Sequence, residues 1–241
     1  GRLAFRYFVE NGGPTGANSD YIGIDTFQFN GVCGPTPTPS ASASASGTPS
    51  ATPTCPPGWS AGPVFPAVGV VRAPGNYFSA NGRFYSIGGR SADALGADFT
   101  HPFEYNPATN TWVTKPSLIP DGQVNNMACG VLTVGGTPQI YCVGGSMSQV
   151  VGTASRVFSY NPATDAFTTL TAADNWPGSQ SGTFLPGGFA VAGNMLYTIG
   201  TFNASGTPPV VTAQVWRFDP NAPVGSRWVA LGATNKKTVL D

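Results

Sequence analysis

Residues 59–241 contain an internal repeat, and this repeat constrains the fold more than any other feature of the sequence. Gly88, Gly144 and Gly200 are spaced 56 residues apart, and each ends a short apolar run. After each of these glycines, an aromatic residue is followed by Asn-Pro or Asp-Pro. A period of roughly 50 residues with several short strands per unit is typical of β-propeller blades. The repeat therefore predicts an all-β fold built from similar four-stranded units.

The amino-acid composition supports this fold class and excludes several kinds of function. Glycine and proline contribute 32 and 23 of the 241 residues, and because neither is tolerated in helix interiors, a mostly helical fold is excluded. Only 9% of the residues are charged, and the 11 basic side chains balance the 11 acidic ones. A nucleic-acid-binding protein needs a basic surface, so we expect no nucleic-acid partner. No apolar stretch reaches the ~18 residues of a membrane helix, so we expect no membrane span in this chain.

Residues 59–231 resemble Kelch repeats. The shared pattern is an aromatic-X-Ile/Val-Gly-Gly strand end, then Tyr-Asn/Asp-Pro, then a further aromatic residue. The third copy departs from it, because Thr201 follows Gly200 and an insertion precedes the last aromatic residue. The resemblance implies that the glycine pairs turn the chain tightly near the propeller axis and that the aromatic residues pack between blades. The residues that carry the motif are Gly88, Gly89, Tyr105, Trp112, Gly144, Gly145, Tyr160, Phe167, Gly200, Phe218 and Trp228.

The number of blades is too small for a closed ring. The segment that begins at Trp59 resembles the one that begins at Trp112, so Trp59 starts the last strand of a blade whose other strands do not precede it. Three blades follow, and residues 232–241 are too short for a fourth. Propellers usually have 4–8 blades. We therefore expect an incomplete Kelch-type propeller of three blades plus one strand, completed by further chain in the native protein or, as the less favoured alternative, by another subunit.

Residues 1–33 have strand character and resemble the last strands of jelly-roll domains in bacterial cleaved-adhesin and choice-of-anchor surface proteins. Residues 2–9 alternate as a half-buried strand does, and residues 20–29 resume the pattern after a glycine-rich turn. The chain begins within a strand pattern, so we expect it to be a processed or truncated piece. Asp20 and Asp25 are candidate Ca²⁺ ligands, since carboxylate oxygens suit that ion. The alternative role for both is turn capping.

Residues 34–58 are predicted to be a linker. Residues 34–54 are exclusively Gly, Pro, Ser, Thr and Ala, so this stretch has no bulky apolar side chain to offset its ordering entropy. Serine and threonine among prolines indicate either an O-glycosylated stalk or a bare flexible linker. The candidate O-glycosylation sites are Thr36, Thr38, Ser40, Thr48, Thr52 and Thr54.

The four cysteines indicate an oxidising compartment rather than a metal site, because none is part of a Cys-X-X-Cys pair. If Gly135 and Gly136 form a hairpin turn, Cys129 and Cys142 face each other across two strands. We therefore expect a structural disulfide there, the alternative being two buried thiols. Cys33 and Cys55 bracket the linker. They either form a second disulfide that closes it into a loop or lie separately at the edges of their domains.

Residues suited to catalysis are scarce. His101 is the single histidine, so a copper site of the galactose-oxidase type, which needs two, is excluded, and a Ser-His-Asp hydrolase would depend on this one residue. Glu104, Asp93 and Asp98 are not in an arrangement that sequence identifies as a glycosidase pair. A ligand pocket would need clustered aromatic and carboxylate side chains in the long loops, predicted at 90–101, 146–154 and 201–212. These loops hold mostly small and aliphatic residues, which argues against such a pocket.

These features predict a non-catalytic protein with a structural or adhesive role in the extracellular space or at the cell surface. We expect it to be bacterial and to be part of a larger chain or a polymeric assembly. We expect it to self-assemble or to bind other surface proteins or glycans, and to need no cofactor apart from a structural Ca²⁺. The alternative is a secreted propeller that binds, or acts on, a carbohydrate or another ligand. Clustered tryptophan, tyrosine and carboxylate side chains in the long loops would favour that alternative.

Overall fold

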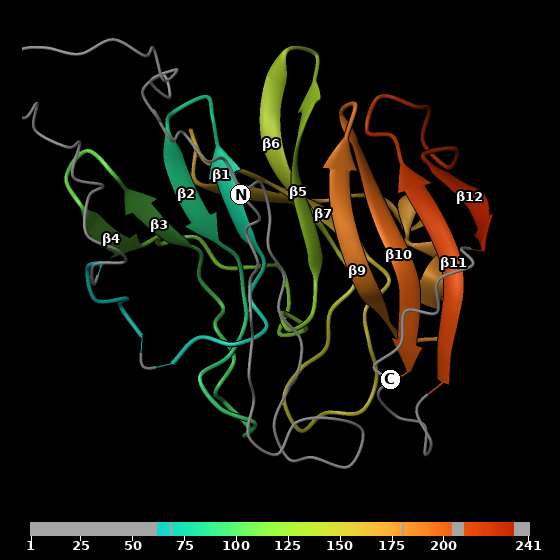
Figure 1. Ribbon diagram of the computed structural model, residues 1–241, viewed down its shortest axis with the longest axis horizontal. Coiled ribbons are helices and arrows are strands. Elements are labelled where there is room, and N and C mark those ends of the chain that lie inside the picture. Colours follow the sequence, from blue (N-terminus) through green and yellow to red (C-terminus); the bar gives the residue numbers. More distant parts are fainter. Residues whose placement is uncertain (1–61, 68, 180, 204–209, 234–241) are drawn as a thin grey trace, which may run out of the picture. The chain divides into compact units, whose positions relative to one another are not determined.

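Antiparallel strands account for nearly all regular structure in this protein. The computed structural model describes residues 62–67, 69–179, 181–203 and 210–233, all within the unit Gly62–Val239 (Figure 1). No α-helix occurs in these ranges, where the only helical turns are two short 3₁₀ helices, Ala172–Asp174 and Pro177–Ser179. The all-β prediction is therefore confirmed.

The strands form three four-stranded sheets, and within each sheet the order in space is the order in the chain. This arrangement is an open one, in which the described sheets do not close on themselves (Figure 1). The first sheet contains β1 (Gly75–Phe78), β2 (Arg83–Ser86), β3 (Phe103–Asn106) and β4 (Thr111–Thr114). The second contains β5 (Ala128–Val134), β6 (Thr137–Val143), β7 (Val157–Asn161) and β8 (Ala166–Thr169). The third contains β9 (Phe184–Ala192), β10 (Met195–Asn203), β11 (Val210–Phe218) and β12 (Trp228–Ala233).

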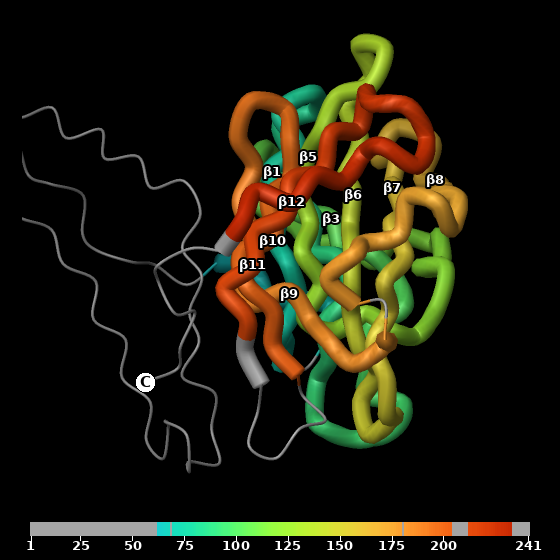
Figure 2. The backbone as a smooth tube through the Cα atoms, turned by 90° about the vertical axis from the view of Figure 1, so that its right-hand side faces the viewer, coloured from blue at the N-terminus to red at the C-terminus, as the bar shows by residue number. Residues whose placement is uncertain are grey.

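The first strands of the three sheets lie next to one another. β5 contacts both β1 and β9, so the second sheet lies between the other two. Figure 1 shows β1, β5 and β9 side by side, with the later strands of the first and third sheets extending away from them. Figure 2 views the molecule from the side on which β12 lies.

Both faces of the second sheet are buried because its side chains alternate between two apolar clusters. In β6, Ile140 and Cys142 point into one cluster, and Tyr141 and Val143 point into the other. We call the cluster between the first and second sheets the first interface and the cluster between the second and third sheets the second interface. The first interface contains Phe78, Tyr85, Ile87, Ile119, Val124, Met127, Cys129, Ile140, Cys142, Phe158 and Tyr160. The second contains Ala128, Leu132, Tyr141, Val143, Val157, Trp176, Leu196 and Phe218.

The third sheet has longer inner strands than the other two, which corrects the predicted loop at 201–212. β10 continues to Asn203, and Thr201 pairs with Thr212 across from it. In the first two sheets the chain turns away at a glycine pair, whereas here Thr201 replaces the second glycine and continues the strand. The register shifts between Ile199 and Thr201, so the glycine between them is absorbed as a β-bulge. The Thr201 and Thr212 hydroxyls are 2.7 Å apart and hydrogen-bonded, and β-branched residues favour the extended backbone.

Candidate functional site

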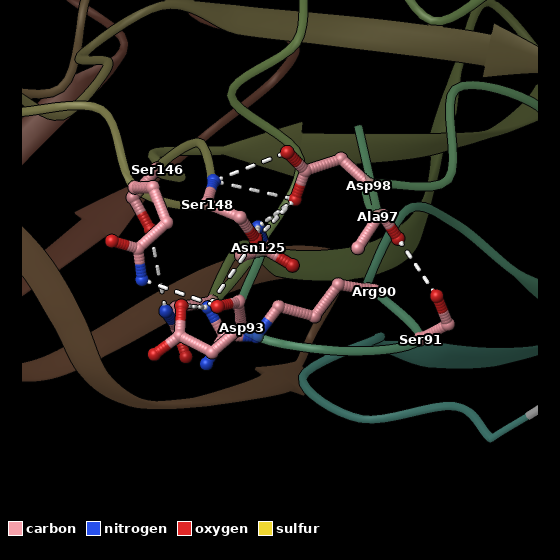
Figure 3. Close-up of polar contacts among 10 residues, drawn as sticks. Arg90, Ser91, Asp93, Ala97, Asp98, Asn125, Ser146 and Ser148 are labelled. Atoms are coloured by element: carbon pink, nitrogen blue, oxygen red, sulfur yellow. Dashed lines mark hydrogen bonds and ion pairs between the residues drawn. The ribbon is translucent and has the colours of Figure 1, made fainter. Parts of the chain in front are cut away.

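Three connections that are far apart in the sequence meet at one end of the first two sheets. They are the β2–β3, β4–β5 and β6–β7 connections. The isolated bridge between Asn125 and Ser146 joins the last two, and a backbone hydrogen bond from the Gly89 amide to the Val124 carbonyl joins the first two. Polar side chains from all three connections form a group that we call the loop cluster (Figure 3). Its members are Arg90, Asp93, Asp98, Asn125 and Ser148.

Asp98 is the centre of the loop cluster. Its carboxylate accepts hydrogen bonds from the Ser148 amide at 3.1 Å, from the Ser148 hydroxyl at 2.8 Å and from the Asn125 amide nitrogen (Figure 3). Asn125 and Ser148 are both 1% exposed. A carboxylate that accepts hydrogen bonds from two other connections joins those loops.

Arg90 is the cation of the loop cluster. It is 7% exposed, and its Nη1 donates to Asp93 and, at 3.3 Å, to the Ser148 hydroxyl. Three buried polar atoms of this end of the protein lack a partner within the described residues: Arg90 Nε, Asn125 Oδ1 and Gln123 Oε1. One donor and two acceptors are therefore available to a polar ligand or to water.

A second group of charges lies beside the first interface, around Glu104. Glu104 is 3% exposed, forms ion pairs with Arg83 and Lys115, and accepts a 2.7 Å hydrogen bond from the Tyr85 hydroxyl. Burial alone would raise the pKa of Glu104, but the hydrogen bonds from Tyr85 and Arg83 and the charge of Lys115 outweigh it, so its pKa lies below the usual range. Burial, together with the bond to Glu104, raises the pKa of Tyr85 to about 12.

Asp165 links this group to the second sheet. It accepts a 2.7 Å hydrogen bond from the Tyr160 hydroxyl and a 2.8 Å bond from the Ser117 hydroxyl. Burial opposes ionisation of Asp165, but these donors and the charge of Lys115 hold its pKa below the usual range. Both carboxylates are thus kept ionised by structural partners, an arrangement unlike a general acid, which needs a raised pKa.

The predicted pairing of Cys129 with Cys142 is present. The two residues face each other in the β5–β6 register, and their sulfur atoms form a disulfide. Both are buried in the first interface. The disulfide therefore lies on the face of the second sheet that contacts the first sheet.

The aromatic motif residues occupy matching cross-strand positions in the three sheets. Tyr160 pairs with Phe167 and Phe218 with Trp228, with ring centroids 4.7 and 5.0 Å apart. The first of these pairs packs at the first interface and the second at the second interface. The remaining pair, Tyr105 and Trp112 at 5.2 Å, lies instead on the outer face of the first sheet.

The motif glycines have backbone conformations and surroundings that exclude other residues. Gly88 has φ +70°, and a Cβ there would overlap the Val124 carbonyl oxygen; Gly145 has φ +114°, and its Cβ would overlap the Gln123 carbonyl oxygen. Gly89, Gly144 and Gly200 also have positive φ. The close approaches to residues 123 and 124 explain how the β4–β5 connection comes near enough to contribute Asn125 to the loop cluster.

His101 has a local partner. Its Nδ1 lies 3.0 Å from the Ser117 carbonyl oxygen, and the ring is partly buried. Among the described residues, no group of three or more His, Cys, Asp or Glu side chains is placed to hold a metal ion. The helical segments of this part of the chain include none long and apolar enough to cross a membrane.

Several predicted sites lie outside the described residues. They include the predicted jelly-roll segment and linker, residues 1–58. The residues concerned are Asp20, Asp25, Cys33, Thr36, Thr38, Ser40, Thr48, Thr52, Thr54, Cys55 and Trp59.

Sequence reasoning did not identify the loop cluster as a unit. It also did not identify the apolar residue that precedes each sheet and packs against the sheet before it or against its own sheet. Each sheet is preceded by an apolar residue followed by proline: Phe65-Pro66, Ile119-Pro120 and Trp176-Pro177. Ile119 is buried in the first interface and Trp176 in the second, while Phe65 packs on Phe103 and Trp112 with centroid distances of 4.5 and 4.8 Å. This recurring apolar-Pro pair is a sequence signal that could have located the three residues.

Comparisons with known proteins assign no family to this chain. No protein-family model matches the sequence, and no curated protein matches it. A search of solved structures finds similarity to the chain described as "Structure of YjhT", with 15% sequence identity and a TM-score of 0.49 over 72% of this chain and 54% of that one. The chain thus spans about half the length of that structure. This similarity is too low to assign either a fold family or an activity.

Proposed function

We propose that this chain belongs to a non-catalytic extracellular or cell-surface protein with a structural or adhesive role, and that its three sheets are blades of a Kelch-type β-propeller. The chain-ordered sheets, the neighbouring first strands and the matching aromatic pairs support the propeller. The Cys129–Cys142 disulfide supports an oxidising, extracellular compartment. Fold alone does not give function, so the functional part rests on the side chains.

The observation that carries the non-catalytic proposal is the engagement of Asp98. Within the described residues, its carboxylate accepts hydrogen bonds from Asn125 and Ser148 of two other connections, so Asp98 joins three connections. Glu104 and Asp165, the other two well-placed carboxylates, are likewise held by structural donors. A surface that is built this way presents a fixed shape to a partner rather than a reactive group.

The proposal extends to the residues outside the described part of the chain. We propose that residues 34–54 carry O-glycans and that the protein contributes to a larger chain or a polymeric assembly. We also propose that Asp20 and Asp25 hold a structural Ca²⁺.

An adhesion assay combined with a turnover assay tests this function. Beads coated with the 241-residue chain should adhere to extracellular material of the native source, and beads coated with heat-unfolded chain should not. The chain should release no product from a panel of polysaccharides and glycosides. Product release that disappears in Asp98→Asn, while the disulfide and the folded spectrum remain, would establish an enzyme and overturn the proposal.

A ligand-binding propeller is the second candidate, and the unpartnered atoms of the loop cluster favour it. Arg90 Nε and Asn125 Oδ1 are buried and have no hydrogen-bond partner in the described part of the chain, which suits a small polar ligand such as a saccharide. Ligand-observed NMR with a set of mono- and oligosaccharides separates the two candidates. Binding that is lost in Arg90→Lys but kept in Val151→Asp, an exposed loop substitution, would support this second function.

A further inference from the structure

The outer face of the third sheet is apolar and hollowed. Five residues of β9, β10 and β11 line an open depression of about 370 Å³ on this face: Ala190, Ala192, Tyr197, Ile199 and Val215. Arg217 shares the face, because it pairs with Tyr197 in the β10–β11 register. We call these six residues the exit face. An exposed apolar surface of this kind is typical of a contact with another protein, a membrane or a ligand.

The repeat shows what covers the same positions elsewhere in the molecule. Tyr197 is equivalent to Tyr85 and Tyr141, each 56 residues before the next, and all three lie in the second strand of their sheets. Tyr85 is 0% exposed and Tyr141 7% exposed, because the next sheet along the chain packs over them. Tyr197 has no following sheet among the described residues and is only partly buried. The exit face therefore has the chemistry of a sheet-to-sheet contact without the second sheet.

The outer face of the first sheet has the complementary chemistry. Aromatic rings dominate it, with Phe84 and Trp112 6.0 Å apart and Phe65 over Phe103 and Trp112. Tyr77, which pairs with Phe84 and is 64% exposed, extends the same face. We call Phe65, Tyr77, Phe84, Tyr105 and Trp112 the entry face; Phe103 is buried against Phe65 and supports this face. The equivalents of Tyr105 in the other sheets, Tyr160 and Phe218, are both 0% exposed because a preceding sheet covers them.

Arg217 gives the exit face a hydrogen-bond donor that needs an acceptor. Its Nε is buried and has no acceptor within the described residues. The equivalent residue in the first sheet, Glu104, faces the second sheet close to Tyr160 and Asp165. At the entry face the corresponding oxygens are the Tyr105 hydroxyl and Asn110 Oδ1, which are 2.8 Å apart. An entry face placed on the exit face would therefore bring oxygen acceptors toward Arg217.

We propose that the exit face of one copy of this chain binds the entry face of a second copy, repeating the contact that joins neighbouring sheets within one chain. The occupant is a second copy because the chain itself carries both complementary surfaces, at opposite ends of its three sheets. Such a contact uses different surfaces on the two partners, so it can continue from copy to copy into a ring or a filament. This inference rests on the proposed structural role and names the partner for it.

Two face-blocking variants test the arrangement. Ala192→Asp puts a charge into the exit face, and Tyr77→Asp puts one into the entry face; both positions are exposed, so both variants should fold. Val151→Asp, at a position that is 90% exposed in the β6–β7 connection, is the control of equal charge. Sedimentation of the full chain should give an average mass that rises with concentration across the micromolar range for the wild type and for Val151→Asp. Each face-blocking variant alone should stay at the mass of one chain.

Mixing the two face-blocking variants gives the decisive result. The mixture still contains one intact exit face and one intact entry face, so its mass should double to that of two chains and rise no further. Association blocked by Ala192→Asp but unaffected by Tyr77→Asp would mean that exit faces bind each other, and would overturn the proposal. A wild type that remains a single chain throughout would also overturn it. Adhesion of beads coated with such a monomer would leave the proposed function standing, so the two failures are distinguishable.

Discussion

The first and second interfaces join similar sheets in the same order, yet they use different chemistry. The first interface contains the Cys129–Cys142 disulfide and has the ionic group of Glu104 beside it. The second contains Trp176, whose indole Nε1 donates to the Thr198 hydroxyl at 3.1 Å inside the cluster. Asp174 supports it from the same connection by pairing with Arg227 at 3.0 Å. The comparison indicates that the repeated backbone sets the spacing of the sheets, while each contact is stabilised by its own set of side chains.

The largest expected effect on stability is at Trp176, which is fully buried in the second interface. Trp176→Ala should lower the free energy of unfolding by about 3–5 kcal/mol, because it removes a fully buried indole and leaves a cavity. Chemical denaturation measures this loss. Ile119→Ala, the matched change at the first interface, should cost about 2–5 kcal/mol and less than Trp176→Ala. An equal or larger loss for Ile119→Ala would contradict the prediction that the larger buried side chain contributes more stability.

The second-largest expected effect comes from the disulfide, which is a feature of the first interface. Replacing both Cys129 and Cys142 by alanine should lower stability by about 3 kcal/mol, since the bond closes a loop with a sequence separation of 13 residues. Thermal unfolding with and without reductant measures the effect. Reductant should lower the melting temperature of the wild type and have a smaller effect on the double variant, in which any remaining sensitivity comes from Cys33 and Cys55. A double variant as stable as the wild type would mean that packing alone holds the first interface.

The ionic group makes the first interface sensitive to pH. Because the pKa of Glu104 is lower in the folded protein than its usual value, the ionised form stabilises the fold at pH values above about 4.3. That stabilisation is lost as the pH falls through the lowered pKa. Glu104→Gln should cost about 1–3 kcal/mol at neutral pH, because Arg83 and Lys115 lose their acceptor.

Urea unfolding at neutral and acidic pH checks this prediction. The difference in stability between wild type and Glu104→Gln should shrink as the pH falls, with a residual acid dependence from Asp165, whose pKa is also lowered. A difference that stays constant down to the most acidic pH would show that Glu104 contributes through shape rather than charge.

The sequence predicted the parts of this molecule that repeat. The spacing of Gly88, Gly144 and Gly200 located three similar units, and the alternation around Gly135-Gly136 placed Cys129 opposite Cys142. The extension of β10 past Gly200 was missed, because the stability of the Thr201–Thr212 pairing depends on a partner strand that a local pattern does not reveal.

The loop cluster could not be predicted because its members have no common spacing. Asp98, Asn125 and Ser148 come from three separate connections, and they meet only after the sheets have packed. Tertiary contacts, rather than local preference, bring them together. The role of Glu104 was missed for the same reason, since Arg83 and Lys115 reach it from neighbouring strands and their connection.

The smallest expected effect tests whether the polar link across the first interface matters for stability. The Ser117 hydroxyl donates to Asp165 at 2.8 Å and so joins the connection after β4 to the turn between β7 and β8. Ser117→Ala removes this bond but keeps the backbone donor from residue 117, which is 3.2 Å from the same carboxylate. The loss should be about 1 kcal/mol, the usual net value of one hydrogen bond. Ser91→Ala is the matched control, because the Ser91 hydroxyl bonds only within its own exposed loop at 3.4 Å and should contribute close to nothing. Denaturant midpoints of the two variants measure the difference, and equal midpoints would show that the link between the sheets through Ser117 adds no stability beyond apolar packing.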